Sequence, residues 1–163
     1  MPLRNAQLAD LPRIVEIYNA AIPGRQATAD TTPVTVASRE PWFREFDPRR
    51  RPLWLLERDA VICGWLSLRS FYGRPAYQTT VEAAVYTAPE SRRTGVGAEL
   101  LAYAIAAAPR LSIRTILAFV FGHNSASLAL FRRFGFRDWG KLPQVAELDG
   151  VERDLLVLGL RTG

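Results

Sequence analysis

The sequence contains only one cysteine, Cys63, and only one histidine, His123. A single cysteine excludes an intramolecular disulfide framework and a pair of cysteine metal ligands. Cys63 lies in the apolar run from Val61 to Leu66, where we expect a small buried strand residue. A thiol nucleophile would need an imidazole partner, and nothing in the sequence connects Cys63 with His123. We therefore expect neither a metal site nor cysteine-based catalysis.

Long hydrophobic runs are also absent. The longest, Leu100 to Ala108 and Leu155 to Leu160, are well short of the roughly 20 apolar residues that span a bilayer. The first residues, Met1 to Asn5, become polar at once and show no signal-type apolar region. The sequence therefore predicts a protein that does not enter the membrane and that acts in the cytoplasm.

Lysine is nearly missing as well, since Lys141 is the only one although the formal net charge is +5. Arginine therefore carries the positive charge, and its guanidinium suits paired hydrogen bonds to phosphate or carboxylate. The chain has 163 residues, of which 48% are hydrophobic, so we expect one folded domain over residues 1–163 with a buried core. The expected partner is anionic: a nucleic acid, an anionic cofactor or an acidic substrate.

Hydrophobic periodicity and turn residues predict the order of the secondary-structure elements. Strands are predicted over Leu3–Ala6, Leu53–Arg58, Val61–Ser70, Gln78–Thr87, Arg114–Phe121, Phe136–Trp139 and Val151–Leu160. Helices are predicted after the cap Asp10, over Val36–Phe46, over Gly95–Ala108, and from the cap Asn124 to Phe134. The stretch from Leu142 to Asp154 is expected to form a strand, a turn and a strand with a solvated rim. The order β-α-α-β-β-β-α-β-α-β-β indicates a mixed α+β fold.

The motif Arg92-Arg93-Thr94-Gly95-Val96-Gly97 lies between a predicted strand and a predicted helix. Glycines at the start of a helix let backbone N–H groups approach phosphate oxygens, and the helix dipole favours that anion. A Walker A loop is excluded because no Gly-Lys-Ser/Thr follows, and Leu100 stands where a dinucleotide fingerprint needs its third glycine. The remaining interpretations are a short motif for the pyrophosphate of coenzyme A and a glycine-containing turn without a ligand.

A second motif follows the next predicted strand and reads Asn124-x-x-Ser127-x-x-Leu130-Phe131-x-x-Phe134-Gly135-Phe136. By itself it describes a helix with an N-cap, an apolar stripe and a C-terminal glycine. Paired with the glycine-rich turn, it resembles the cofactor motifs of the GNAT superfamily of N-acetyltransferases. The resemblance covers most of the chain and extends towards the phosphinothricin and methionine-sulfoximine acetyltransferase subfamily. It is carried by Leu3 to Phe43 and by Tyr77-x-x-Thr80-Val81-Glu82-x-x-Val85-Tyr86.

This resemblance implies a central, mostly antiparallel sheet of about seven strands, splayed between strands 4 and 5 and flanked by about four helices. It implies acetyl-CoA as the acetyl donor, without a metal, in the cleft between the strands that end at Thr87 and Phe121. The residues that it assigns to the cofactor are Val85, Tyr86, Thr87, Arg92, Arg93, Thr94, Gly95, Val96, Gly97, Ala98, Asn124, Ser127, Phe131 and Arg133. It also implies a homodimer, with the C-terminal strands as the candidate interface.

Glu82 is the residue to which we assign the chemistry. An amine is mostly protonated at neutral pH, and only its free lone pair attacks a thioester. A carboxylate at the mouth of the splayed strands can accept that proton, directly or through a water, if burial raises its pKa. The alternative is that Glu82 is an exposed strand residue or one half of an ion pair. His123 is a weaker candidate for an auxiliary base, and a turn histidine is the simpler interpretation.

The sequence departs from the subfamily where an acceptor would bind. Phe131 stands where many members have a tyrosine or histidine that protonates the leaving thiolate, but a thiol pKa of about 8.5 makes this loss tolerable. Ala84 replaces a frequent serine and Tyr72 an arginine, which argues against phosphinothricin or methionine sulfoximine as the natural substrate. The residues predicted at the acceptor site are Tyr72, Gly73, Arg74, Tyr77, Glu82 and Ala84, with Trp42 as a further wall and Arg74 as the candidate carboxylate partner.

Together these inferences predict a cytoplasmic N-acetyltransferase that transfers an acetyl group directly from acetyl-CoA to a primary amine of a small, amino-acid-like molecule. Backbone N–H groups near Val85 would stabilise the oxyanion, and no activated nucleophile for a covalent acetyl-enzyme is apparent. A peptide N-terminus and a polyamine stay open as other acceptors. A non-catalytic module that senses acyl-CoA or binds nucleic acid also stays open, although the aromatic residues are not interleaved with arginines in a run that would stack bases.

Overall fold

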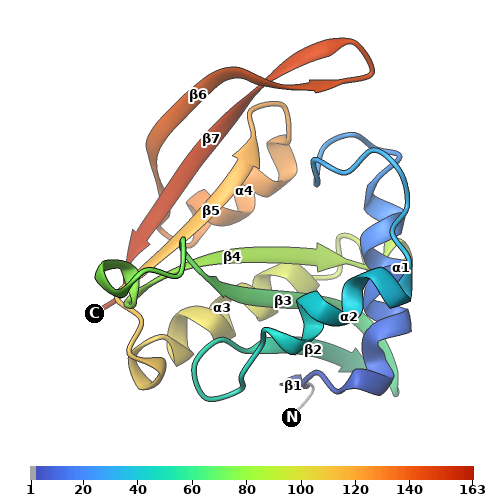
Figure 1. Ribbon diagram of the computed structural model, residues 1–163, viewed down its shortest axis with the longest axis vertical. Helices are drawn as coiled ribbons and strands as arrows, with labels where there is room; N and C mark the ends of the chain where they lie inside the picture. Colours follow the sequence, from blue (N-terminus) through green and yellow to red (C-terminus); the bar gives the residue numbers. More distant parts are fainter. Residues whose placement is uncertain (1–2) are drawn as a thin grey trace.

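The computed structural model describes residues 3–163 and contains a seven-stranded sheet with helices packed against it (Figure 1). The strands are β1 (Leu3–Asn5), β2 (Leu53–Arg58), β3 (Val61–Ser70), β4 (Thr80–Thr87), β5 (Thr115–Phe121), β6 (Arg137–Leu148) and β7 (Val151–Arg161). The helices are α1 (Leu11–Ala21), α2 (Val36–Arg44), α3 (Val96–Ala107) and α4 (Ser125–Arg133). This order confirms the predicted succession of elements and the α+β class.

Strand β6 joins the predicted strand over Phe136–Trp139 with the strand predicted from Leu142, and it ends at Leu148 beside β7. The strand, turn and strand predicted over Leu142–Asp154 are therefore confirmed. Its pairing with β7 shifts register twice, after Asp138 and again between Leu142 and Ala146. Pro143 lies inside the second irregularity, and the backbone of Gln144 has a φ of 53°. Such bulges break the alternation of side chains that reveals a strand in a sequence, so the sequence predicted two segments where the structure has one strand.

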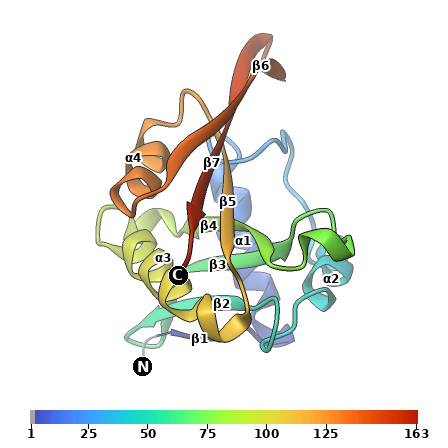
Figure 2. The same ribbon diagram turned by 90° about the vertical axis from the view of Figure 1, so that its left-hand side faces the viewer.

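The order of the strands in the sheet is β1-β2-β3-β4-β5-β7-β6, and only β4 and β5 pair in parallel. Their pairing is short and joins Thr80–Glu82 to Thr115–Leu117. Beyond it the two strands diverge, and Figure 2 shows β5, β7 and β6 rising together away from β1 to β4. The predicted splay at strands 4 and 5 is therefore confirmed, and residues 83–87 of β4 have no partner on the β5 side.

The two faces of the sheet carry separate hydrophobic clusters. Trp54 and Leu56 of β2 join the cluster that includes α3, whereas Leu53 and Leu55 join the cluster that includes α1. Side chains alternate along a strand, so neighbouring residues serve opposite faces. The same alternation along β4 places Val81 and Ala83 on the α3 side and Glu82, Ala84 and Tyr86 on the side of α1 and α2.

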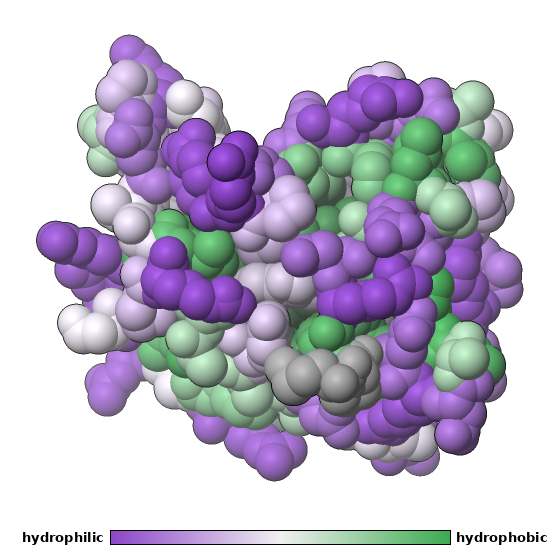
Figure 3. All heavy atoms as spheres, turned by 90° about the horizontal axis from the view of Figure 1, so that it is seen from below, coloured by the Kyte–Doolittle hydropathy of each residue, from purple (hydrophilic) through white to green (hydrophobic). Residues whose placement is uncertain are grey.

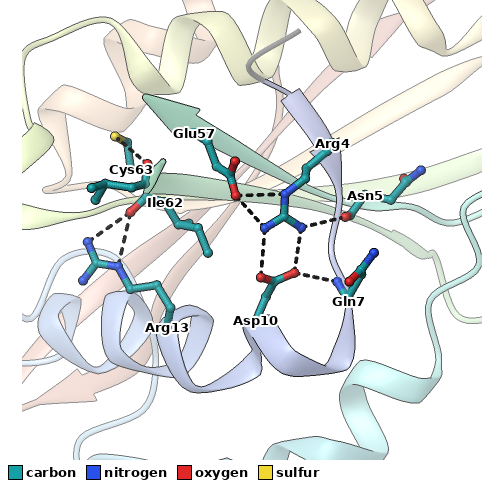
Figure 4. A network of polar contacts seen from close by, with 9 residues as sticks. Arg4, Asn5, Gln7, Asp10, Arg13, Glu57, Ile62 and Cys63 are labelled. Carbon is teal, nitrogen blue, oxygen red and sulfur yellow. Dashed lines mark hydrogen bonds and ion pairs between the residues drawn. The ribbon is translucent and has the colours of Figure 1, made fainter. Parts of the chain in front are cut away.

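A network around Arg4 ties β1 to the start of α1 and to β2 (Figure 4). The Arg4 guanidinium donates two hydrogen bonds to Asp10, at 2.8 and 2.9 Å, and two to Oε1 of Glu57, at 2.9 and 2.5 Å. The hydrogen bonds from Arg4 lower the pKa of the Asp10 carboxyl below its ordinary value. Farther along α1, Arg13 donates to the carbonyl of Ile62 on β3. These contacts hold α1 in place across the sheet.

The surface is mainly hydrophilic on the face that Figure 3 shows, where hydrophobic patches are separated by polar side chains. By contrast, the β6–β7 hairpin carries several exposed hydrophobic residues: Trp139, Leu142, Val145 and Val151. Within residues 3–163, no helix is both long and apolar enough to cross a membrane.

Candidate active site

The splay between β4 and β5 exposes backbone at the level where α3 begins. The turn before α3 is sharp, because Arg93 and Gly95 have φ values of 61° and 85°. Arg58 holds it from outside by donating to both the carbonyl and the hydroxyl of Thr94, each at 3.0 Å. The turn is therefore held by its own backbone conformation and by Arg58 of the neighbouring strand β2. It places the N-terminus of α3 at the splay between β4 and β5.

Gly97 is the position at which this turn approaches its neighbours. A Cβ atom there would lie 3.2 Å from Cδ2 of Leu130, 3.8 Å from Cγ1 of Val85 and 3.9 Å from Oγ1 of Thr87. Gly97 thus faces both β4 and α4, which together form the walls of the splay. A bare glycine backbone at this point leaves room for a ligand that runs between the two elements.

The same turn is suited to an anion. The first N–H groups of a helix lack intrahelical acceptors, and the helix dipole adds positive potential there. Arg92 and Arg93 are exposed beside the turn, and neither forms an ion pair within residues 3–163. The motif from Arg92 to Ala98 therefore forms a positively charged turn at the start of a helix, with Val96 buried and Ala98 half-buried behind it, and its contact with a phosphate stays a prediction.

Asn124 closes the other wall at the start of α4. Its Oδ1 accepts from the N–H of Ser127 at 3.1 Å, which caps the helix, and its Nδ2 donates to the carbonyl of Gln26 at 3.2 Å. His123 contacts the carbonyl of Arg25 through Nε2 at 2.7 Å. These two residues therefore join the loop after α1 to the far side of the splay, a role for His123 that the sequence did not indicate.

The loop after α1 also contacts the near side of the splay. The hydroxyl of Tyr86 on β4 donates to the carbonyl of Ala27 at 3.1 Å. On the far side, the Arg25 guanidinium pairs at 2.9 Å with Asp149 in the β6–β7 turn. The loop thus bridges the end of the opening between β4 and α4.

Two residues assigned to the cofactor lie elsewhere on α4. Phe131 is only 3% exposed and packs edge-to-face on Phe136, with ring centroids 5.0 Å apart. Arg133 is exposed and lies over the ring of Phe134. Phe131 is therefore a core residue of this structure, and contact of either residue with a cofactor stays a prediction.

Glu82 lines a cavity of about 180 Å³ between the sheet and the helices α1 and α2. Its walls are mostly aromatic and aliphatic, with Trp65 and Tyr86 from the sheet and Trp42 from α2. Burial raises the pKa of the half-buried Glu82 carboxyl above its ordinary value, while the positive charge of Arg69 acts in the opposite direction. The cavity therefore places a carboxylate of enhanced basicity beside apolar walls.

The predicted acceptor residues are divided by the structure. Glu82 and Ala84 line the cavity, as does Trp42, but Tyr72, Gly73, Arg74 and Tyr77 lie in the connection between β3 and β4 and do not line it. Tyr72 is 77% exposed and stacks with Phe71 and Tyr77.

Sequence reasoning missed eight residues of the cavity wall: Ile14, Val15, Tyr18, Val34, Arg39, Trp65, Ser67 and Arg69. For Trp65 and Arg69 a signal existed, because alternation along β3 puts them on the same face as Glu82 of β4. No comparable signal existed for Tyr18 and Arg39, which approach from separate helices. Within residues 3–163, no cluster of three or more His, Cys, Asp or Glu side chains could hold a metal ion.

Comparison with known proteins agrees with this geometry. The chain matches the Acetyltransferase (GNAT) family over residues 12–136. It is 46% identical over 160 residues to the Bacillus subtilis protein named "Putative phosphinothricin acetyltransferase YwnH", covering 98% of each chain. It is 34% identical to the L-methionine sulfoximine/L-methionine sulfone acetyltransferase of Pseudomonas aeruginosa, covering 97% of this chain and 92% of that one.

A solved structure adds the donor. The phosphinothricin acetyltransferase of Sinorhizobium meliloti in complex with acetyl-CoA superposes with a TM-score of 0.93 at 28% identity, covering all of this chain and 90% of that one. Acetyl-CoA is an anionic molecule with a pyrophosphate, and the glycine-rich turn, the free arginines and the splay described above fit it. The chain belongs to the GNAT acetyltransferase family and is an acetyl-CoA-dependent N-acetyltransferase.

Proposed function

We propose that the acetyl acceptor is the primary amine of a small, amino-acid-like molecule that binds in the cavity beside Glu82. A volume of about 180 Å³ suits a molecule the size of one amino acid rather than a folded or extended partner. The relative from Pseudomonas aeruginosa is named for two small amino-acid derivatives, L-methionine sulfoximine and L-methionine sulfone. The aromatic and aliphatic walls favour an acceptor with an uncharged side chain.

In this proposal Glu82 is the general base. The single observation that carries it is the half-buried carboxylate in a cavity of mostly aromatic and aliphatic walls, next to the splay. Burial shifts the pKa of Glu82 upward, so the carboxylate holds a proton more readily than an exposed one would. It accepts the proton of the ammonium group, directly or through one water, and leaves the amine free to attack.

Acetyl-CoA supplies the acetyl group as a thioester. The amine nitrogen forms a bond to the acetyl carbon and loses a second proton to water. The carbon–sulfur bond breaks, and coenzyme A leaves as the thiolate without an acetyl-enzyme. Backbone N–H groups near Val85, on the unpaired edge of β4, stabilise the oxyanion. Because Phe131 has no proton to donate and is buried, the thiolate takes its proton from water, which a thiol pKa of about 8.5 permits.

The donor is held, in this proposal, by the three walls of the splay. The backbone of Val85, Tyr86 and Thr87 binds the pantetheine amides, and the turn from Arg92 to Ala98 binds the pyrophosphate. Asn124 and Ser127 contribute at the start of α4, where the Asn124 amide already donates to Gln26. Arg133 completes the set from the exposed side of α4. Phe131 is buried and contributes by packing against Phe136 in the core, which holds α4 in place.

The base is tested by Glu82→Gln, which keeps the shape of the side chain and removes its basicity. We expect kcat/KM for the acceptor to fall by about 10²- to 10⁴-fold, the usual contribution of a general base. Glu147→Gln, an exposed glutamate on β6, is the matched control and should leave turnover unchanged. Turnover of Glu82→Gln at the parent rate would show that Glu82 is not the base.

The acceptor class is tested by counting released thiol with acetyl-CoA and a panel of amino acids, polyamines and short peptides. Amino acids with uncharged side chains should give the largest signal. A larger signal from a polyamine or a peptide N-terminus would replace the proposed acceptor. Binding of acetyl-CoA without thiol release from any acceptor would favour the non-catalytic sensor.

We also propose that residues 1–163 act as one catalytic domain, as a homodimer and in the cytoplasm. The exposed apolar side chains of the β6–β7 hairpin support the dimer, because a second copy would remove them from water. Sedimentation at micromolar concentration should give the mass of a dimer, and Val145→Glu should give a monomer. Val61→Glu, a charge placed at an exposed apolar site outside the hairpin, is the control. A monomeric parent protein would contradict the dimer.

A further inference from the structure

Arg51 is a buried cation without a carboxylate partner. It is 8% exposed and is the only charged residue among the buried residues of the chain between positions 3 and 163. Its guanidinium donates to Oγ of Ser70 at 2.8 Å and to the carbonyls of Arg50 and Gln78 at 2.9 and 2.7 Å. All three acceptors are neutral, so the positive charge of Arg51 is solvated by dipoles and not neutralised. A buried charge in this state is costly, which favours an anion beside it.

Arg51 lines a second cavity, of about 430 Å³, in which such an anion can lie. This cavity is also lined by Ser70, Tyr72 and Gly73 and by the ion pair of Arg69 with Glu45, whose Nη2–Oε2 distance is 3.1 Å. Two guanidinium groups and one carboxylate leave one positive charge in excess. The pair of Arg69 and Glu45 is half-exposed, so Arg69 can exchange Glu45 for another carboxylate at little cost.

Arg69 connects this cavity with the one beside Glu82, since it lines both. Its Cα is the direct partner of the Glu82 Cα across β3 and β4. On the other side of β3, the N–H of Leu68 donates to the carbonyl of Pro52, which brings Arg51 to the end of β3 as well. A carboxylate and two guanidinium groups therefore follow one another across the sheet, from Glu82 through Arg69 to Arg51.

We propose that Arg69 and Arg51 form the subsite for the carboxylate of the acceptor, so that the enzyme selects α-amino acids over neutral amines. This rests on the proposed function and specifies how its site recognises the acceptor. The amine lies at Glu82, the uncharged side chain lies among the aromatic walls, and the carboxylate lies at Arg69 and Arg51. Glu45 forms an ion pair with Arg69 in the absence of the acceptor, and this pair breaks when the carboxylate of the acceptor binds to Arg69.

This subsite differs from the one that the sequence suggested. Arg74 was the candidate partner for a carboxylate, but it lines neither cavity. Tyr72 lies at the rim of the second cavity, with a backbone φ of 56° that non-glycine residues rarely adopt. The residues that meet the carboxylate therefore come from β3 and from the segment before β2, and not from the β3–β4 connection.

The test compares L-methionine, L-leucine and L-phenylalanine with their carboxamides, which have the same shape and no carboxylate. We expect kcat/KM to be about 10- to 100-fold higher for the acids, the usual effect of charge-assisted hydrogen bonds. The amine of a carboxamide is less basic than that of the acid, so more of it is in the free, reactive form near neutral pH. Amine basicity alone would therefore favour the carboxamide, which is the opposite preference. Thiol release from neither member overturns the proposed function, whereas equal release from both overturns only the subsite.

Three variants then assign the preference to residues. Arg69→Gln should lower the ratio of kcat/KM for the acid to kcat/KM for the carboxamide to about threefold or less. The ratio is compared within the variant, because the charge of Arg69 also acts on Glu82 and its loss changes the rate with both acceptors. Glu45→Gln should lower KM for the acid about two- to fivefold, because it removes the competing carboxylate. Arg49→Gln, whose side chain is 90% exposed, is the control and should change neither value. A normal preference in Arg69→Gln would overturn the proposal.

Arg51 and Arg74 are tested in the same way. Arg51→Gln should also weaken the preference, and thermal unfolding shows whether it has folded. If it fails to fold, the results for Arg69 and Glu45 still decide the proposal. Loss of the preference in Arg74→Gln, with Arg69→Gln normal, would place the carboxylate in the β3–β4 connection and overturn the subsite.

Discussion

Substitution of Gly97 tests whether the turn before α3 binds the donor. The structure predicts two different effects of size at this position. In Gly97→Ala, the new methyl group meets Cδ2 of Leu130 at 3.2 Å and otherwise makes ordinary contacts. Leu130 is half-buried and its methyl group needs to move by only a few tenths of an ångström, while alanine gains about 1 kcal/mol of helix propensity over glycine. The unfolding free energy of Gly97→Ala should therefore change by less than about 1 kcal/mol.

Gly97→Trp puts an indole between β4 and α4, where the donor is expected to pass. If two backbone hydrogen bonds to phosphate are lost at about 1.5 kcal/mol each, acetyl-CoA binds about 150-fold more weakly. Gly97→Ala should weaken binding by about tenfold, because one methyl group obstructs the close approach of the backbone only in part.

Isothermal titration of the two variants with acetyl-CoA measures these effects, and thermal unfolding confirms that each has folded. Ala106→Trp is the matched control, because Ala106 is exposed on the same helix and lies far from the turn in sequence. It should bind acetyl-CoA as the parent does. A folded Gly97→Trp with unchanged affinity would refute the assignment of the turn to the donor.

Three further outcomes follow from the same structure. Because burial raises the pKa of Glu82, kcat/KM should increase with pH through a transition above the ordinary range of a glutamate, which a pH–rate profile measures, and a flat profile would contradict the base. Because Arg4 lowers the pKa of Asp10, that carboxyl stabilises the fold above its unfolded pKa and loses this effect as the pH falls through its folded pKa. Asp10→Asn should therefore lower the unfolding free energy by about 1–3 kcal/mol at pH 7 and reduce its dependence on pH below about pH 4. Asn124→Ala should lower the unfolding free energy by about 0.5–2 kcal/mol through loss of the helix cap and free the loop at Gln26, whereas Asn124→Asp should keep the cap.

Most of the fold could be predicted because its signals are local. The alternation of Val81, Ala83 and Val85 with Glu82 identified β4, and Asn124 and Gly135 marked the two ends of α4. The continuity of β6 between its two predicted segments could not be predicted, because its two irregularities in register depend on the partner strand β7. Hydrogen bonds to a distant strand sustain a bulged element that no local pattern reveals.

The donor site was likewise easier to predict than the acceptor site. The turn from Arg92 to Gly97 is continuous in sequence. Its glycines indicated a close approach of the backbone to its neighbours, which the structure shows between Gly97 and Leu130. The acceptor cavity is assembled from α1, α2, β3 and β4, so its wall has no motif. The family resemblance assigned Tyr72 to that wall, in place of a frequent arginine, yet it is 77% exposed and lies outside the cavity beside Glu82.

By itself, then, the sequence determined the order of elements, the turn that suits a phosphate, and the carboxylate on β4. Each of these depends on residues within one helix turn or one strand. Only the tertiary structure decided that Arg69 lies across from Glu82, that Arg51 is buried without a carboxylate, and that Phe131 belongs to the core. These facts depend on strand register and on packing between distant segments, because burial and charge pairing are properties of the assembled sheet and not of a residue's neighbours in the chain.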